Sequence, residues 1–496
     1  MTLVVVLACG AAMVAGGLRW LRIAQREHYL AGSVTRFSLR WWFATPLGMA
    51  LAVAATLAVP ATLWWTGAGL VVAAVETLGP PGLGLRGRTS SLAWTDRLRR
   101  LAAGVGVVVV VGISAGLLVH PVITVAVALL LPAAVDLLLA LLAPLEGRLG
   151  RPWVDRAAEA LRTSGATVVA ITGSYGKTST KGYIAHLLGG VRRVVASPAS
   201  FNNRMGLARA INENLGGGVD VFVAEMGTYG PGEIADLCSW IPPTVGVITA
   251  IGPVHLERFG SEDQIVAAKA EILAMAEAAV LNVDDARLAT LADREAGRMR
   301  VIRAGSDSGD VVVSPHGSVS VGGVVIGTAP PTVHPTNLAC ALGVAVALGV
   351  DPDRVADRLA TLPEPPHRRT VATGASGARI IDDTFNSNPA GARAALSTLT
   401  QLVIPGRRVV VTPGIVELGR RQAAENRALG EAATRGADVL IVVGRTNRKA
   451  LLEGAREGPG AVMVMDTRDE AVEWVRTNLG PRDAVLYEND LPDHYP

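Results

Sequence analysis

The sequence is poor in cysteine and in charge. Its three cysteines, Cys9, Cys238 and Cys340, lie far apart and lack the spacing of metal ligands, which argues against a disulfide framework or a zinc module and is typical of a reducing compartment. The net charge is only +3, and no basic stripe like that of a nucleic-acid-binding protein is present. The length predicts about three domains. Apart from two short basic loops, residues 1 to 145 are nearly all apolar, whereas the rest has the composition of an α/β protein.

The first apolar run, residues 3–18, is followed by basic residues, whereas a secretory signal peptide carries them in front. More apolar runs follow at residues 41–75, 101–119 and 122–142. Pro60 divides the 41–75 run, which at about 17 residues or more per span is long enough for two short helices. We therefore predict an all-α transmembrane region over residues 1–150 with five helices. A single re-entrant hairpin over residues 41–79 is the alternative.

The basic residues of this region give it an orientation. The first basic loop carries Arg19, Arg22, Arg26, Arg36 and Arg40, and the second carries Arg86, Arg88, Arg97, Arg99 and Arg100. With five spans both loops lie on one side, together with everything after residue 145. Positive residues mark the cytoplasmic side, so we expect a multi-pass protein of the cell membrane with its catalytic domains in the cytoplasm, where ATP is.

Asp136 is the one carboxylate deep in the last predicted span. An acidic residue within a membrane span is a functional candidate. The structural alternative is a carboxylate that faces the interior of the bundle and accepts hydrogen bonds from a hydroxyl or backbone group. No second ionisable residue is expected at a similar depth, which favours the structural alternative.

A glycine-rich loop follows a short strand-like run. Residues 167–172 form a β-branched run typical of a buried parallel strand. Gly173-Ser174-Tyr175-Gly176-Lys177-Thr178-Ser179 comes directly after it, and apolar residues then recur at helical spacing from Tyr183 to Leu188. Strand, glycine turn and helix form the context of a phosphate-binding loop. The match departs from the general G-x-x-x-x-G-K-[ST] pattern, because its first glycine falls at Ile171.

The residue types in the loop predict ATP and Mg²⁺ as cofactors. Backbone N–H groups and the helix N-terminus face the phosphates, Lys177 reaches the terminal phosphates, and a hydroxyl of Thr178 or Ser179 can hold Mg²⁺. Glu225 ends another apolar run, where a carboxylate at the carboxyl edge of a sheet can hold a hard cation. The other residues expected to bind the nucleotide here are Thr172, Gly173, Ser174, Tyr175 and Gly176.

The landmarks after the loop carry a family resemblance. They are the segments Phe201-Asn202-Asn203-Arg204-Met205-Gly206, 221–227 around Glu225, 248–257 around His255, 267–272 around Lys269, 281–285, 337–345, Arg368 and 381–389. In this order, over residues 165–445, the succession resembles the Mur ligases, most closely the D-alanyl-D-alanine-adding type. The resemblance implies ATP-dependent amide synthesis, in which a carboxylate attacks the γ-phosphorus and an amine then displaces phosphate from the acyl phosphate.

The resemblance also implies roles for single residues. Glu225 and His255 would hold magnesium, and Lys269 would be carbamylated, so that it bridges the metal as a carboxylate-like group. Asn282 and Asn337 would contact adenine, Asp285 and Asp383 would lie near the ribose or phosphates, and Arg368 would reach the phosphates when the C-terminal domain closes. The residues expected at the substrate are Asn202, Asn203, Asn386, Asn388, Glu488 and Asp490.

Three departures from the family concern the substrate. The small N-terminal domain that grips the UDP-sugar in these ligases is absent, and the apolar region stands in its place. Near the C-terminus, where a Lys-Gly-Ser-Arg-like segment is usual, this chain has Glu488-Asn489-Asp490, which suggests an incoming amine with positive charge. Asn426 stands where the family has a histidine.

We therefore predict an α/β protein with a P-loop central domain (151–365) and a Rossmann-like C-terminal domain (366–496). The leading hypothesis is a membrane-anchored amide ligase of cell-wall synthesis, with small-molecule or lipid-linked carboxylate and amine substrates. The alternatives are a poly-γ-glutamate-type ligase and a non-catalytic nucleotide-binding scaffold. The joint presence of Lys177, Glu225, His255 and Lys269 argues against the scaffold. The sequence does not predict an oligomeric state.

Overall fold

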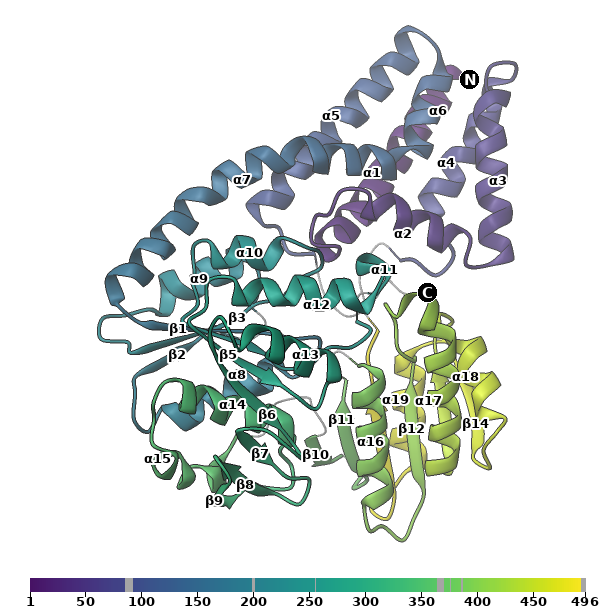
Figure 1. Ribbon diagram of the computed structural model, residues 1–496. Coiled ribbons are helices and arrows are strands. Elements are labelled where there is room, and N and C mark those ends of the chain that lie inside the picture. The colour runs from purple at the N-terminus through teal and green to yellow at the C-terminus, as the bar shows by residue number, and fades with distance from the viewer. Residues whose placement is uncertain are drawn as a thin grey trace. The chain divides into compact units, whose positions relative to one another are not determined.

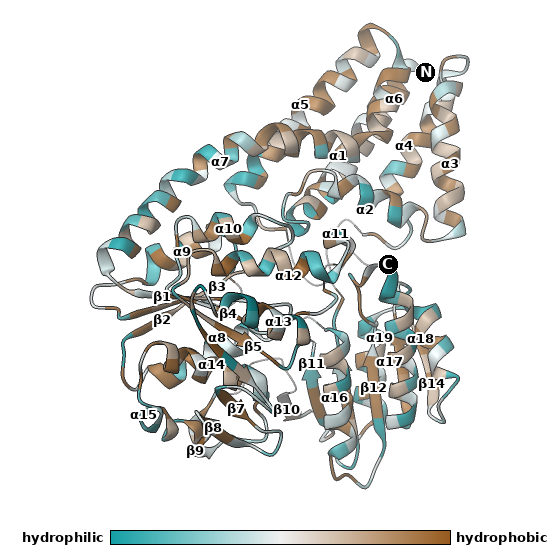
Figure 2. Cartoon of the chain, viewed as in Figure 1, coloured by the Kyte–Doolittle hydropathy of each residue, from teal (hydrophilic) through white to brown (hydrophobic). Residues whose placement is uncertain are grey.

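The chain forms two compact units, Met1–Leu149 and Gly150–Asp490, shown in a computed structural model (Figure 1). The structure describes residues 1–84, 92–198, 201–254, 256–363, 370–374, 376–384 and 387–491. In Figure 2 the N-terminal helices are mostly hydrophobic, whereas the C-terminal half of α7 is hydrophilic.

The first unit is helical. Its helices are α1 (Thr2–Arg26), α2 (Ser33–Trp42), α3 (Pro46–Ala61), α4 (Gly69–Leu78), α5 (Asp96–Leu118), α6 (Pro121–Leu129) and α7 (Leu131–Ser164), the last of which continues into the second unit. Local sequence sets several of the boundaries. Thr45 and His120 cap α3 and α6, each followed by a proline in the first turn, and Thr95 caps α5.

The prediction of five spans is wrong for the described residues. Two helices, α1 and α5, are long and apolar enough to cross a membrane, and the number rises to four if each of two bent pairs is one span. The pair α2 and α3 bends by 115°, and the pair α6 and α7 bends by 73°. Helix α4 has only 10 residues, fewer than the roughly 17 needed for one span. Pro60 lies near the end of α3 instead of between two spans.

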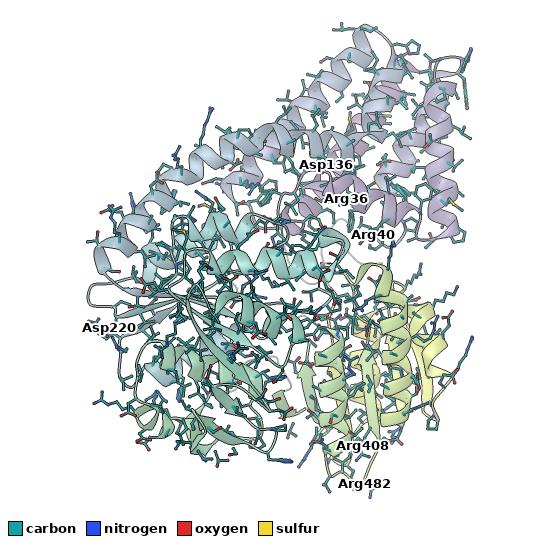
Figure 3. All side chains as sticks on the ribbon, in the orientation of Figure 1. Arg36, Arg40, Asp136, Asp220, Arg408 and Arg482 are labelled. Carbon is teal, nitrogen blue, oxygen red and sulfur yellow. The ribbon has the colours of Figure 1, made fainter. Side chains whose placement is uncertain are left out.

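The basic residues also differ from the prediction. Arg19, Arg22 and Arg26 continue α1 instead of forming a loop. Arg19 is buried, and its guanidinium donates to the carbonyl oxygens of Glu76, Thr77 and Leu78 at 3.1–3.2 Å, where it neutralises the partial negative charge at the end of α4. Arg36 and Arg40 are exposed on α2 (Figure 3), and Arg97, Arg99 and Arg100 lie in α5. Arg86 and Arg88 lie outside the described residues.

Asp136, labelled in Figure 3, has the structural role. Its carboxylate accepts hydrogen bonds from Val34 N at 3.2 Å, Thr35 N at 2.7 Å and Thr35 Oγ1 at 2.6 Å. These donors lie in the first turn of α2, whose N-cap residue, Gly32, has no side chain to accept them. A carboxylate from a distant helix therefore caps α2, as the alternative of hydroxyl and backbone bonding predicted.

A nine-stranded sheet with the order β2-β3-β1-β4-β5-β6-β7-β8-β9 forms the centre of the first half of unit 2. Strands β1 to β7 pair in parallel and β7 to β9 are antiparallel. The strands are β1 (Thr167–Thr172), β2 (Val194–Ala196), β3 (Val221–Glu225), β4 (Val245–Ile248), β5 (Ala278–Asn282), β6 (Arg300–Gly305), β7 (Val311–Val313), β8 (Ser318–Val321) and β9 (Val324–Thr328).

Helices cover both faces of this sheet (Figure 1). They are α8 (Lys177–Leu188), α9 (Arg204–Asn214), α10 (Glu233–Cys238), α11 (Leu256–Phe259), α12 (Glu262–Ala270), α13 (Ala286–Glu295), α14 (Pro335–Ala347) and α15 (Pro352–Ala356). Alternate residues of β1 belong to different cores: Val169 and Ile171 pack with α8 and α14, whereas Val168 and Ala170 pack with α9. A strand buried on both faces explains the continuous apolar run in the sequence.

The second sheet of unit 2 has six strands in the order β10-β11-β15-β12-β13-β14. They are β10 (Thr370–Thr373), β11 (Arg379–Asp383), β12 (Arg408–Thr412), β13 (Val439–Val443), β14 (Ala461–Met465) and β15 (Ala484–Glu488), with helices α16 (Pro389–Gln401), α17 (Gln422–Gly436), α18 (Arg448–Ala455) and α19 (Arg468–Asn478). Only β10 is antiparallel to its neighbour. The other pairs are parallel, which confirms the Rossmann-like character of this sheet.

Candidate active site

The glycine loop lies between β1 and α8, as the sequence predicted. Gly173 has φ +154° and Gly176 has φ +82°, conformations that favour glycine. A Cβ on Gly176 would overlap the side-chain oxygen of Asn337, so the loop passes directly against α14. Lys177 begins α8, and its Nζ donates to Gly173 O at 2.6 Å across the loop. The backbone therefore curls around the lysine, in the manner of a phosphate-binding loop.

The segment after β4 holds the loop in place. Ser174 N donates to Ala250 O at 2.8 Å, and Ser174 Oγ accepts from Gly252 N at 3.0 Å. The Tyr175 ring lies so close to Gly252 that a Cβ there would overlap it. Thr172, the last residue of β1, is fully buried. These contacts fix the loop conformation without any nucleotide.

Glu225 ends β3 beside the loop and is almost completely buried. The Thr178 hydroxyl lies 3.1 Å from Glu225 Oε2 and 3.3 Å from Oε1. Asn202 Nδ2 lies 3.5 Å from Oε1, and Lys181 Nζ forms a buried ion pair with Oε2 at 2.9 Å. The predicted metal ligands Thr178 and Glu225 therefore come together at the carboxyl edge of the sheet.

Lys269 lies in α12, whose N-cap is Ser261. Its side chain is buried, and no hydrogen bond or ion pair of its ammonium group is found in the described part of the chain. Burial, and secondarily the charge of Lys177, lower the pKa of Lys269 well below its usual value. A lowered pKa favours the neutral form of the amine, which is the nucleophilic form.

The donor set fits a magnesium ion that arrives with a nucleotide. In the described residues no three His, Cys, Asp or Glu side chains come together. Mg²⁺, however, is usually held by one or two carboxylates, with phosphate oxygens and waters as its other ligands. Glu225 and the Thr178 hydroxyl supply that share.

The residues expected near the base and ribose make structural contacts of their own. Asn282 Nδ2 donates to Thr249 O at 2.8 Å, and its Oδ1 accepts from Asp284 N at 3.1 Å. Asp285 caps α13 through Arg287 N and pairs with the Arg287 guanidinium at 2.8 Å. Asn337 lies against Gly176 of the loop. The nucleotide roles of Asn282, Asp285 and Asn337 stay predictions.

Two of the residues expected at the substrate are helix caps. Asn203 Oδ1 accepts from Gly206 N at 2.9 Å at the start of α9, and Asn388 Oδ1 accepts from Gly391 N at 2.8 Å at the start of α16. Asn202 lies near Glu225. Asp490 forms an ion pair with Arg468. Their substrate roles stay predictions.

Glu488 and Asp383 lie side by side at the ends of two parallel strands. Glu488 is fully buried and accepts hydrogen bonds from the Ser387 and Thr412 hydroxyls. The pKa of Glu488 is raised to about 7, mainly by burial; the Ser387 and Thr412 hydroxyl bonds oppose the rise and the charge of Asp383 adds to it. The predicted role of Glu488 toward an amine stays a prediction, and its burial rules out direct substrate contact in this conformation.

Three predicted site residues, His255, Arg368 and Asn386, lie outside the described residues. The opposite case is Lys181, which sequence reasoning missed. It follows Lys177 by one helical turn, a spacing that places both lysines on the same face of α8. That spacing was the available signal.

Comparison with known proteins identifies the family. Residues 171–323 match the Mur ligase middle domain, and residues 367–487 match the Mur ligase glutamate ligase domain. A UDP-N-acetylmuramoyl-tripeptide–D-alanyl-D-alanine ligase from Mycobacterium tuberculosis is 35% identical over 375 residues, which cover 66% of this chain and 71% of the relative. The chain belongs to the Mur ligase family. Among Mur ligases it is of the MurF-like, ATP-dependent type.

Solved Mur ligases agree with this placement. The structure of MurF from Acinetobacter baumannii is similar with a TM-score of 0.59 at 25% identity. The match covers 69% of this chain and 77% of the Acinetobacter baumannii chain. The structure of MurF from Thermotoga maritima in complex with ADP is similar with a TM-score of 0.58 at 27% identity. The match covers 69% of this chain and 80% of the Thermotoga maritima chain. Both Mur ligase domain matches lie within unit 2.

Proposed function

We propose that this Mur ligase joins a carboxylate and an amine through an acyl phosphate, with Mg²⁺, at the cytoplasmic face of a membrane. The observation that carries the proposal is the burial of Lys269, whose pKa is lowered by that burial and by the charge of Lys177 of the phosphate loop. A buried lysine without a counter-charge is costly. When a neutral lysine amine adds to CO₂ it forms a carbamate and releases one proton, so Lys269 would become an anionic oxygen ligand near the phosphate loop.

In the first step the substrate carboxylate oxygen attacks the γ-phosphorus of ATP and ADP leaves. In the second step the amine nitrogen attacks the acyl carbon, loses a proton and expels phosphate. Lys177 stabilises the charge that develops on the transferred phosphoryl group. Thr178 and Glu225 would hold Mg²⁺, which would supply positive charge against the phosphates. His255 and Arg368 keep the roles that the resemblance implies.

The proposed substrates rest on the named relatives and on the positions at which this chain departs from the family pattern. The named relatives act on UDP-N-acetylmuramoyl-tripeptide and D-alanyl-D-alanine, and this pair is the first candidate. Asp490 lies in an acidic segment that stands where a basic segment is usual, which favours an amine that carries extra positive charge. A lipid-linked carboxylate is the alternative donor, because the N-terminal unit contains helices able to cross a membrane.

The test is phosphate release by the full-length protein in detergent or nanodiscs. We expect phosphate release above the ATP-only rate with UDP-muramoyl tripeptide and either D-alanyl-D-alanine or a cationic amine. L-glutamate is tested in parallel as the substrate of a poly-γ-glutamate-type ligase. Lys177→Met should lower the rate by a factor on the order of 100 or more, whereas the exposed Lys449→Met is the matched control. If no pair stimulates release, the proposed substrates are wrong.

A further inference from the structure

The chain has four lysines among its 46 basic residues, and three of them lie at the phosphate loop. Lys177 is in the loop, Lys269 is buried near it, and Lys181 is buried against Glu225. The fourth, Lys449, is exposed. Since arginine is the chain's usual cation, a lysine at position 181 calls for a property that arginine does not have.

Lys181 engages the two oxygens of Glu225 unequally. Its Nζ lies 2.9 Å from Oε2, and this oxygen also has the closer contact with Thr178, at 3.1 Å. Among the described residues, the contacts of Oε1 are longer, 3.3 Å to Thr178 and 3.5 Å to Asn202. Because the carboxylate is almost completely buried, it has little room to rotate. One oxygen is therefore occupied and the other is offered to the site.

We propose that Lys181 is a positioning residue that sets the metal selectivity of the site: by holding Oε2 it limits Glu225 to one-oxygen coordination and so favours Mg²⁺ over Ca²⁺. The inference rests on the proposed function in one respect, the assignment of Glu225 as a ligand of the nucleotide-borne metal.

The chemistry of the two cations explains the selectivity. Mg²⁺ requires a compact octahedral shell and keeps several waters, whereas Ca²⁺ accepts more oxygens and often takes both oxygens of one carboxylate. A carboxylate with one oxygen bound to an ammonium cannot chelate in that way. Arginine would not serve, because its planar fork pairs with both carboxylate oxygens and would leave none for the metal. Lysine, as a point charge, takes one.

The two substitutions that follow have opposite expected effects. Lys181→Met releases both oxygens, so the ratio of the Ca²⁺ to Mg²⁺ dissociation constants should fall roughly 10- to 100-fold, the effect usual for residues that hold a metal ligand. Lys181→Arg should weaken both cations together. Lys449→Met is the control and should match the wild type.

The measurement is calorimetric titration of Mg²⁺ and Ca²⁺ into the full-length protein in detergent, saturated with a non-hydrolysable ATP analogue. Nucleotide binding without metal is measured in parallel, and thermal unfolding verifies folding. A merely structural role would change both affinities alike, so a wild-type ratio in folded Lys181→Met overturns the inference. If Lys181→Met does not fold, the infrared carboxylate bands of the wild type are measured on adding Mg²⁺. Bands typical of two-oxygen coordination overturn the proposed role of Lys181, and bands typical of one-oxygen coordination support it.

Glu225→Gln separates this inference from the proposed function. If the variant loses Mg²⁺ binding while Lys181→Met keeps the wild-type ratio, the metal assignment holds and only the role of Lys181 is wrong. If Glu225→Gln binds Mg²⁺ like the wild type, the metal assignment itself is wrong, and the role of Lys181 is overturned with it.

Discussion

The hydroxyl of Thr412, at the end of β12, donates a 2.5 Å hydrogen bond to the buried carboxyl group of Glu488 at the end of the neighbouring strand β15. The contact explains how an acidic residue can occupy a fully buried position in this sheet. Burial, opposed by this hydrogen bond, raises the pKa of Glu488 to about 7, so the group titrates near neutral pH.

The stability of the second sheet should therefore depend on Glu488. The folded pKa of about 7 is above the ordinary value of 4.5, so the folded state binds the proton more tightly than the unfolded state. The stabilisation is complete below pH 4.5 and is lost as the pH rises through 7. Urea unfolding of Glu488→Gln should lack this loss, which we expect to be up to about 3 kcal/mol in the wild type. A wild-type free energy of unfolding that rises between pH 5 and 8, relative to Glu488→Gln, would contradict this account.

Gly176→Ala should disrupt the phosphate loop. Its φ of +82° disfavours a side chain, and the new Cβ would overlap Asn337. We expect loss of nucleotide binding, measured by titration with ADP. The control is Gly182→Ala in the same helix, where a Cβ meets nothing within 4 Å. That variant should bind ADP normally and be more stable by roughly 0.5–1 kcal/mol. Normal ADP affinity in Gly176→Ala would show that the loop does not bind phosphates in this conformation.

Lys269 should carry a carbamate when the protein is active. Because burial lowers the pKa of its amine and so favours the neutral form, incubation with ¹³C-labelled bicarbonate should produce a carbamate carbonyl signal in the NMR spectrum that is missing from Lys269→Arg. Ligase activity should fall when CO₂ is removed and return when bicarbonate is added. An active protein with no such signal, and no response to CO₂, would sink the carbamate assignment while leaving the phosphate loop intact.

Asp136 should stabilise the N-terminal unit as the cap of α2. Asp136→Ala leaves the first N–H groups of α2 without an acceptor and should cost about 1–2 kcal/mol, seen as a lower unfolding temperature in detergent. Asp136→Asn keeps one oxygen acceptor and should lose less. Should Asp136→Asn abolish activity at an unchanged unfolding temperature, the carboxylate has the functional role instead.

Local sequence determined the nucleotide half of this protein. The β-branched run of β1, the glycines of the loop and the serine before α12 each specify their own backbone conformation, because the preference resides in a few neighbouring residues. The order of these elements then predicts that Lys177, Thr178 and Glu225 meet at one edge of a parallel sheet, as they do.

Only the tertiary structure decided the contacts between segments far apart in the chain. The pairing of Lys181 with Glu225, the burial of Glu488 under Ser387 and Thr412, and the bonding of Asp136 to Thr35 each join residues from separate elements. The apolar composition of residues 1–145 indicated membrane helices, but it could not give their number. Helix length depends on where bends and caps lie. Two of the capping contacts come from distant helices, because Asp136 of α7 caps the start of α2 and Arg19 of α1 caps the end of α4. Periodicity assigns a residue to a face of its element, whereas its partner on that face depends on how the elements pack.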